Sequence, residues 1–448
     1  MAPKRKQPEK GDGERSFFMP LAHLPEAEQL AVKTQIAEKL KTEVRKEMGE
    51  RAKKRGYLEA KFEPEQVAIA HLEKSATYAF RNKCEFSFGK DKNGDDELGF
   101  IERVGLTKFV VLKIEADNPI VHPAIYAVVQ QVKTVLMTAF PVFDREKRTG
   151  LLRNVSVRMG RDDLCSLVVQ IFHSGESDHV LASLVDKLAL VDKVVSKHVL
   201  FNLGLTDSCQ NKPLCVTPDQ PAIPMRVLGL DFAVQPSSFF QTNSAACALL
   251  YGLVADWALG VDQRSRTKPL LVFDLCCGVG TIGQVLARRA LDRAKTQVKV
   301  VGVDIVVEAI EDARANAKSN FGDADEVQLE FIAGRAEEVV GRLIKEHEEQ
   351  LTSSEVVCVV DPPRAGLHPS VLRCLRQTES IDRIIYVSCN WESLARDLVT
   401  LCEYVTDVVD DPGVTAPFRC VKLQPVDMFP LTEHCEMLIE LVRSRPSV

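Results

Sequence analysis

The chain has 448 residues, of which 45% are hydrophobic and 27% are charged, and its formal net charge at pH 7 is −6. This length predicts two or three domains, and the composition is typical of a soluble globular protein. No run of about 18 apolar residues occurs and the N-terminus lacks an apolar core, so neither a transmembrane helix nor a secretory signal is predicted. The net charge argues against binding of nucleic acid by bulk charge, but it is compatible with a local basic face.

The cysteines indicate the compartment. Thirteen cysteines are spread along the chain, and no Cys-x-x-Cys pair occurs. This pattern is typical of a reducing compartment, and it favours neither a zinc site nor an iron–sulfur cluster. We therefore expect no metal, and a location in the cytoplasm, the nucleus or both, with a mitochondrial fraction left open. The run Lys4-Arg5-Lys6 is interpreted as part of a solvated tail, with nuclear import as the alternative.

The first 75 residues divide into a predicted disordered tail (1–22) and a predicted helical segment (23–75). Apolar residues recur at roughly helical spacing between Pro25 and Arg55, and Gly56 follows the last turn. The end of this helix is rich in basic residues, namely Arg45, Lys46, Arg51, Lys53, Lys54 and Arg55. We expect a solvated helix face there, with a contact to nucleic acid as the alternative.

Residues 76–235 predict a smaller, sheet-rich α+β domain. Short segments alternate apolar and polar residues, as half-buried antiparallel strands do, for example in KFVVLKIEA and RNVSVRMG. Two helical stretches interrupt them, near Pro123–Thr138 and His179–Leu188.

Residues 236–448 predict an α/β domain of the doubly wound, Rossmann-like class. Strands alternate with helices, which favours a parallel sheet covered on both faces. The last two strands have no helix between them and are expected to form an antiparallel pair at the end of a seven-stranded sheet. The predicted strands are Leu270–Leu275, Val298–Ile305, Val327–Ala333, Val356–Asp361, Arg383–Ser388, Val421–Met428 and Cys435–Val442.

A glycine-rich loop joins the first of these strands to a helix. Its glycines, Gly278-x-Gly280-x-x-Gly283, match the dinucleotide fingerprint, in which a pyrophosphate lies against the start of the helix. Asp274 stands just before the loop and would oppose a phosphate, so it favours a neutral or cationic ligand such as S-adenosyl-L-methionine. Asp304 ends the next strand, where a carboxylate can accept both ribose hydroxyls of either cofactor. An NAD-binding loop therefore stays open on these residues alone.

Reactive side chains cluster at the ends of three other predicted strands, at Asp361-Pro362-Pro363-Arg364, Ser388-Cys389-Asn390 and His434-Cys435-Glu436. Open α/β sheets bind their ligands at the carboxyl ends of their strands. A thiol that adds to carbon 6 of a uracil ring makes carbon 5 nucleophilic enough to accept a methyl group. A base must then remove the proton from carbon 5, and donors must bind the ring oxygens. Cys389, Glu436 and Arg364 fit these three roles.

Several motifs together resemble those of the RNA uracil-5-methyltransferase family. They are FDLCCGVGTIG, VDPPRAGLHPSV, YVSCNWESLARDL and HCEML, preceded by FFQTNSAA. YAFRNKCEFSFG, GLDFAVQPSSFFQTN and GRAEEV are similar to the eukaryotic branch that methylates uridine 54 of tRNA. The resemblance extends from about Leu24 to Leu441, which is nearly the whole chain.

The resemblance implies a role for each matching residue. It implies that Cys389 is the nucleophile, that Glu436 removes the carbon-5 proton, and that the product is ribothymidine in the T-loop of tRNA. It also implies that S-adenosyl-L-methionine contacts Gln241, Cys276, Asp304 and Asp361.

Three departures from the family pattern qualify this resemblance. Trp391 replaces the usual proline after Ser-Cys-Asn, and Cys276 replaces a tyrosine of bacterial relatives. The iron–sulfur cysteines and N-terminal barrel of the ribosomal RNA branch are missing, as is the RNA-recognition domain of some animal members. Methylation of ribosomal RNA is the alternative within the family, and the missing iron–sulfur cysteines count against it. A catalytically silent scaffold that folds tRNA is the alternative outside enzymes.

Binding of tRNA is expected to use the sheet-rich domain, the basic helix and the cleft between domains. We predict phosphate contacts by Arg81, Lys83 and Arg158, with ordinary surface charges as the alternative. Contacts of this kind make binding weaken steeply with salt. A uridine within a folded T-loop must also leave its stack before Cys389 can reach it.

Overall fold

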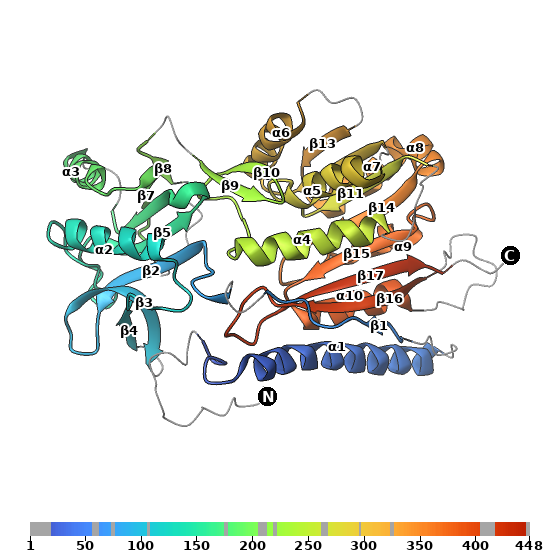
Figure 1. Ribbon diagram of the computed structural model, residues 1–448, viewed down its shortest axis with the longest axis horizontal. Helices are drawn as coiled ribbons and strands as arrows, with labels where there is room; N and C mark the ends of the chain where they lie inside the picture. Colours follow the sequence, from blue (N-terminus) through green and yellow to red (C-terminus); the bar gives the residue numbers. More distant parts are fainter. Residues whose placement is uncertain are drawn as a thin grey trace.

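The computed structural model describes residues 19–55, 62–72, 77–104, 108–173, 178–204, 213–217, 222–260, 268–294, 297–322, 327–403 and 417–444. The predicted tail and Lys4-Arg5-Lys6 therefore lie mostly outside the described residues. Two sheets lie side by side along the longest axis of the molecule, with α4 (Ser244–Leu259) beside the larger one (Figure 1).

The larger sheet has eight strands in the order β1-β16-β17-β15-β14-β11-β12-β13. Neighbouring strands are parallel except at β17, which runs antiparallel to both β15 and β16. The predicted α/β class and the C-terminal antiparallel pair are thus present. The sheet gains one strand over the seven predicted, because the two-residue β1 pairs with β16. The strands are β1 (Glu65–Gln66), β11 (Leu270–Leu275), β12 (Val298–Asp304), β13 (Val327–Ala333), β14 (Glu355–Val360), β15 (Arg383–Ser388), β16 (Phe418–Val426) and β17 (Glu436–Arg443).

Apolar helix faces cover both sides of this sheet. One buried cluster joins it to α1 (Glu26–Arg55), α7 (Ala336–Glu346), α9 (Pro369–Gln377) and α10 (Trp391–Cys402), with the short α8 (Glu348–Ser353) beside them. A second cluster joins the opposite face to α4, α5 (Thr281–Arg289), α6 (Val307–Phe321) and the hairpin of β9 (Ile223–Val227) and β10 (Leu230–Val234). A π-helical turn, Ala290–Ala294, continues α5. Burial of both faces explains why the central strands β11, β14 and β15 are nearly continuous apolar runs.

The smaller sheet has seven strands in the order β4-β3-β2-β5-β6-β7-β8, antiparallel except between β6 and β7. Helices α2 (Pro123–Met137) and α3 (Asp178–Ala189) bury its apolar face. His122 starts α2 by accepting a hydrogen bond from the Ala124 N–H, with Pro123 at the first helical position. The strands are β2 (Lys83–Lys90), β3 (Asp96–Val104), β4 (Lys108–Lys113), β5 (Leu152–Met159), β6 (Cys165–Ile171), β7 (Val194–Phe201) and β8 (Leu214–Cys215), and a 3₁₀ turn spans Arg161–Asp163.

Candidate active site

The larger sheet brings Cys389 and Glu436 next to each other. Ser388, the last residue of β15, pairs with Met437 in β17. Cys389 follows Ser388 and Glu436 precedes Met437, so both residues stand one position beyond this pair on adjacent strands. Asp361 follows β14, the other neighbour of β15. The thiol and the two carboxyl groups therefore meet at the same end of neighbouring strands, the end that faces the smaller sheet (Figure 1).

Glu436 is a buried carboxyl group with spare hydrogen-bonding capacity. Its side chain is 3% exposed, and its Oε2 atom has no hydrogen-bond partner among the described residues. Burial raises the pKa of Glu436 to about 8; Asp361 adds to this rise and Arg364 opposes it. A carboxyl group with a pKa near neutral pH can accept a proton from a substrate and release it again.

Cys389 is exposed, whereas the other cysteines of the described segments are buried or half-buried. Partial burial of the sulfur raises the pKa of Cys389, as do the charges of Glu436 and Asp361, while Arg364 lowers it. The exposed Arg364 side chain thus favours the thiolate of Cys389 and the ionised form of Glu436.

The loop that carries Arg364 is attached to the elements that carry Cys389. Asn390 Nδ2 donates to the Arg364 carbonyl at 2.9 Å, while Asn390 Oδ1 accepts from the Glu392 N–H and so starts α10. Asp397 of α10 accepts from the Leu367 N–H at 2.8 Å and from the Tyr386 hydroxyl at 2.6 Å. The chain segments that carry Cys389 and Arg364 are therefore hydrogen-bonded to each other.

The glycine-rich loop is fixed by the two carboxylates that precede and follow it. Asp304 Oδ2 accepts from the Gly278 N–H at 2.8 Å, and Asp274 Oδ2 accepts from the Gly283 N–H at 2.9 Å. A Cβ atom at Gly283 would lie 2.8 Å from Val300 Cγ1, so the approach of α5 to the sheet requires glycine there. Asp274 is fully buried and its pKa is raised by burial to about 7. Asp274 thus supports the loop instead of facing a ligand.

A pocket opens beside this loop, and two of the four predicted cofactor contacts line it. Cys276 and Asp361 are among its lining residues, together with Phe239, Phe240, Tyr251, Cys277, Gly278, Val279, Thr281 and Ile282. The other two predicted contacts support its wall. Asp304 binds the Gly278 N–H, and the buried Gln241 side chain hydrogen-bonds to the Tyr251 hydroxyl.

Tyr251 and the two phenylalanines were not predicted from sequence. Tyr251 lies in the largely apolar helix α4, where a single tyrosine carries no functional signal. Phe239 and Phe240 precede Gln241 in the motif that was noted, so the motif itself could have indicated them.

The chemistry of this pocket fits a cationic cofactor. Asp361 lines it, and burial raises the pKa of this carboxyl group to about 7. A positively charged sulfonium would favour the ionised carboxylate, whereas a pyrophosphate would meet repulsion. Gln241, Cys276, Asp304 and Asp361 are the residues that would hold or shape such a site.

The structure contradicts the predicted phosphate contact of Arg158. Its side chain is 4% exposed, and it donates to the carbonyl oxygens of Ser238 at 3.2 Å and Phe240 at 3.5 Å. Burial lowers the pKa of Arg158 to about 10. Arg158 therefore supports the segment that leads into Gln241 and cannot reach a phosphate. Lys83 is half-buried and pairs with Glu85 at 2.9 Å, and Arg81 donates to the Lys83 carbonyl at 3.2 Å.

The basic end of α1 lies far from Cys389. Helix α1 packs along α10, and its C-terminal end lies at the end of the larger sheet that is remote from the smaller sheet (Figure 1). There Arg51 pairs with Glu47 and with Glu403, the residue that follows α10. The helix axis from Lys33, in the first half of α1, to Arg51, near the end of α1, is about 27 Å long. RNA contact by this stretch stays a prediction, and any such contact lies away from the reacting residues.

The described ranges contain neither a metal-binding cluster nor a membrane-spanning helix. No group of three or more His, Cys, Asp or Glu side chains in these ranges is arranged to hold a metal ion. None of the helices within them has the length and apolar character needed to cross a membrane.

Comparison with known proteins places most of this chain in one family. Residues 179–443 match the sequence model of the family described as tRNA (Uracil-5-)-methyltransferase. Human tRNA (uracil-5-)-methyltransferase homolog A is 34% identical over 385 residues, which cover 80% of this chain and 55% of that protein. The mouse homolog A is 32% identical over 469 residues, which cover 98% of this chain and 71% of that protein.

A solved structure shows the same fold. It is the tRNA (uracil-54, C5)-methyltransferase of Pyrococcus abyssi in complex with S-adenosyl-L-homocysteine, which is 24% identical. The alignment has a TM-score of 0.63 and covers 97% of this chain and 87% of that one. The fold class expected from the motifs is confirmed. The sequence matches also confirm the expected enzyme family.

Proposed function

The chain belongs to the tRNA (uracil-5-)-methyltransferase family, and on that premise we propose that it methylates carbon 5 of uridine 54 in tRNA through a covalent Cys389 adduct. The observation that carries this proposal is the placement of Cys389 and Glu436 side by side beyond the Ser388–Met437 pair. S-adenosyl-L-methionine, when bound, supplies an electrophilic methyl group in this reaction. The smaller sheet, beyond these strand ends, is proposed to bind the RNA.

The first step assigned to this chain is nucleophilic addition. The Cys389 thiolate forms a bond to carbon 6 of the uracil ring, and the electron pair of the carbon 5–carbon 6 double bond moves into an enolate. Arg364 favours this step because its charge lowers the pKa of the Cys389 thiol. Carbon 5 becomes nucleophilic and accepts the methyl group.

The second step is removal of the carbon-5 proton. Glu436, in its ionised form, takes this proton, the ring double bond re-forms, and the bond between sulfur and carbon 6 breaks to release the thiolate. The buried and unpaired Oε2 atom of Glu436 is suited to this role because no other described group competes for it. The pKa of about 8 allows the protonated carboxyl group to lose its proton again between turnovers.

Release of tritium from carbon 5 tests this proposal. Purified protein is mixed with an unmodified tRNA transcript that carries tritium at carbon 5 of its uridines, with and without S-adenosyl-L-methionine. We expect release that depends on the cofactor, is lost in Cys389→Ala, and is absent when uridine 54 is replaced by cytidine. Cys215→Ala, which removes a half-buried thiol of the smaller sheet, is the matched control and should retain activity.

The same assay separates the alternatives. Release from ribosomal RNA but not from tRNA would identify the other branch of the family. No release from either RNA, together with tRNA binding that survives Cys389→Ala, would instead support the scaffold interpretation.

A further inference from the structure

Helix α1 carries a charged residue where its sequence pattern calls for an apolar one. Ala37, Leu40, Val44 and Met48 form the buried stripe of this helix, and Lys33 occupies the preceding position of the same stripe. The Lys33 side chain is fully buried. A leucine or methionine would pack there without desolvating a charge, so packing alone does not account for lysine.

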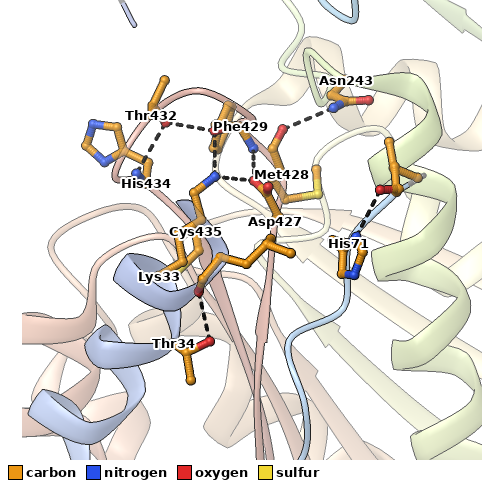
Figure 2. Close-up of polar contacts among 12 residues, drawn as sticks. Lys33, Thr34, His71, Asn243, Asp427, Met428, Phe429, Thr432, His434 and Cys435 are labelled. Carbon is orange, nitrogen blue, oxygen red and sulfur yellow. Dashed lines mark hydrogen bonds and ion pairs between the residues drawn. The ribbon is translucent and has the colours of Figure 1, made fainter. Parts of the chain in front are cut away.

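Lys33 bonds to the loop that leads to Glu436. Its ammonium group pairs with Asp427, which is 5% exposed, and donates to the Phe429 carbonyl at 2.8 Å. Asp427 follows β16, and the loop from Asp427 to Cys435 joins β16 to β17. Figure 2 shows Lys33 directed at both partners, with Cys435 close by. Burial lowers the pKa of Lys33, and the charge and the hydrogen bond of Asp427 oppose this change.

The loop is organised around the groups that Lys33 binds. The Phe429 carbonyl also accepts from the Thr432 hydroxyl at 2.9 Å, and Asp427 Oδ1 accepts from the Phe429 N–H at 3.2 Å. The Thr432 hydroxyl in turn accepts from the His434 N–H at 3.2 Å. A continuous series of hydrogen bonds thus connects Lys33 to the residues just before Glu436.

Other segments of the chain meet the same loop. Asn243, two residues after Gln241, donates to the Met428 carbonyl at 3.2 Å. The Leu21 N–H donates to the Leu431 carbonyl at 3.0 Å, and the Asp427 N–H donates to the Ala70 carbonyl at 2.8 Å. The loop therefore contacts α1, the segments that contain Leu21 and Ala70, and the segment of Asn243 that follows Gln241.

We propose that Lys33 is a positioning residue for the reaction, which fixes the Asp427–Cys435 loop and thereby holds Glu436 against Cys389. This inference rests on the proposed function, since it assigns Lys33 to the proton-removal step. Lys33 acts through the geometry of the loop, because the charges that shift the pKa of Glu436 come from Asp361 and Arg364. Lys33 lies outside residues 179–443, so the helix contributes to a site whose other parts lie in the matched region.

The test compares two variants with a control on the same helix. Lys33→Met removes the ion pair with Asp427 and the hydrogen bond to the Phe429 carbonyl, but it leaves Asp427 buried without its cation. The double variant Lys33→Met/Asp427→Asn leaves no unpaired buried charge and keeps an acceptor for the Phe429 N–H, so it is expected to fold. Leu40→Ala creates a cavity in the same buried face of α1 but away from the loop, so it controls for the effect of lost stability.

The readout is the covalent protein–RNA adduct that survives denaturation, measured together with turnover. If Glu436 is misplaced, addition and methyl transfer proceed while proton removal slows. We expect at least a tenfold fall in kcat for both Lys33 variants and accumulation of adduct as in Glu436→Gln. The kcat/KM for tRNA should be unchanged, because the steps up to methyl transfer are intact. Leu40→Ala should lower Tm without accumulation of adduct. Wild-type turnover in the double variant, or loss of activity without adduct, would overturn the proposal.

A second readout separates this inference from the proposed function. Hydrogen–deuterium exchange of residues 428–435 should accelerate in Lys33→Met and in the double variant, but not in Leu40→Ala. An inactive wild-type protein would refute the proposed function, and exchange would still report whether Lys33 holds the loop. An unchanged hydrogen–deuterium exchange rate of residues 428–435 in both Lys33 variants would refute the proposal that Lys33 fixes the loop, whatever the activity of the variants.

Discussion

At the scale of single residues, the proton-accepting carboxyl group is set by opposing neighbours. Glu436 has a pKa raised to about 8 by burial and by Asp361, and lowered by Arg364. Only the ionised form of Glu436 can take the carbon-5 proton. The rate of adduct breakdown should therefore rise with pH and level off above about pH 8.

Removal of the nearby cation should move this profile. Arg364→Met removes the charge that favours ionised Glu436, so the midpoint should shift to higher pH, while Arg364→Lys should keep it near the wild-type value. The measurement is decay of a preformed adduct as a function of pH at saturating cofactor, which avoids the titration of Cys389. A midpoint that is the same in both variants and the wild type would contradict this assignment.

Arg158 illustrates a residue whose role differs from its prediction. It supports the carbonyl groups of Ser238 and Phe240 beside the cofactor pocket. Arg158→Met should destabilise the protein by about 2–4 kcal/mol, because buried carbonyl groups lose their donor. It should also weaken binding of S-adenosyl-L-methionine, as measured by calorimetry.

The salt dependence of tRNA binding provides the comparison for Arg158. A residue that contacts no phosphate releases no counterion, so Arg158→Met should leave the slope of log K against log salt unchanged. In contrast, Lys83→Met should reduce the slope by about one if Lys83 contacts a phosphate. A reduced slope in Arg158→Met would restore the original prediction for that residue.

At the scale of elements, the attachment of the Arg364 loop to α10 depends on one glycine. Gly366 has φ +82°, and a Cβ atom there would lie 2.8 Å from Asp397 Oδ2. Gly366→Ala should therefore cost about 1–3 kcal/mol in unfolding free energy and should lower methyl transfer. Gly94 has φ +88°, and a Cβ atom there would meet no other atom within 4 Å, so Gly94 is the matched control.

The two glycine variants share the cost of positive φ but not the clash. Gly94→Ala should lose only the backbone contribution, about 1 kcal/mol, with full activity. Urea unfolding and single-turnover methylation measure the two effects. Equal losses in both variants would show that the Asp397 contact does not position the loop.

Local periodicity predicted the elements of the larger sheet well and its long-range contacts poorly. β11, β13 and β15 begin and end at the predicted residues. For β11 and β15 the signal is the nearly uninterrupted apolar run of a strand that is buried on both faces, whereas in β13 exposed Gln328 and Glu330 alternate with less exposed residues. β1 has two residues, too few for any periodic signal. Arg158 alternates with apolar residues as a solvent-facing side chain would, but a segment some 80 positions later covers it.

In the candidate site, too, residues with a local sequence signal could be predicted, and residues that depend on long-range contacts could not. Cys389 could be predicted because reactive residues that follow apolar runs collect at the carboxyl end of an open sheet. Glu436 begins β17 and reaches the same end because β17 is antiparallel to β15, and the resemblance supplied the roles of both residues. Lys33 could not, because a lysine in a mostly polar helix looks solvated until its partner, 394 positions away, is known. Tyr251 was missed for a related reason, since its hydrogen bond to Gln241 appears only in the folded chain.

At the scale of the whole molecule, the site combines contributions from both ends of the chain. Helix α1 near the N-terminus binds the loop before β17 near the C-terminus, and Asn82 of the smaller sheet region donates to the Gln241 carbonyl at 2.9 Å. The reacting residues are thus held by contacts between segments that are distant in sequence. Such an arrangement couples the integrity of the site to the overall fold, so conditions that change the protonation of the buried carboxyl groups should change global stability as well as activity.

Three of these carboxyl groups make stability depend on pH. Burial raises the pKa of Asp274 and Asp361 from 3.8 to about 7 and that of Glu436 from 4.5 to about 8. Between these limits the folded protein holds protons that the unfolded chain has already released. Their contribution to stability is therefore complete below about pH 4 and is lost as pH rises through 7 to 8.

Urea unfolding at pH 6 and pH 8 measures this effect. The unfolding free energy should be lower at pH 8 by an amount on the order of a few kcal/mol, since each unit of pKa difference corresponds to about 1.4 kcal/mol. Asp361→Asn imitates the protonated carboxyl group at every pH, so it should flatten the dependence and raise stability at pH 8. It should also weaken cofactor binding, because the pocket loses its carboxylate. If stability instead rises between pH 6 and pH 8, these groups are ionised in the folded protein and their burial does not control its pH response.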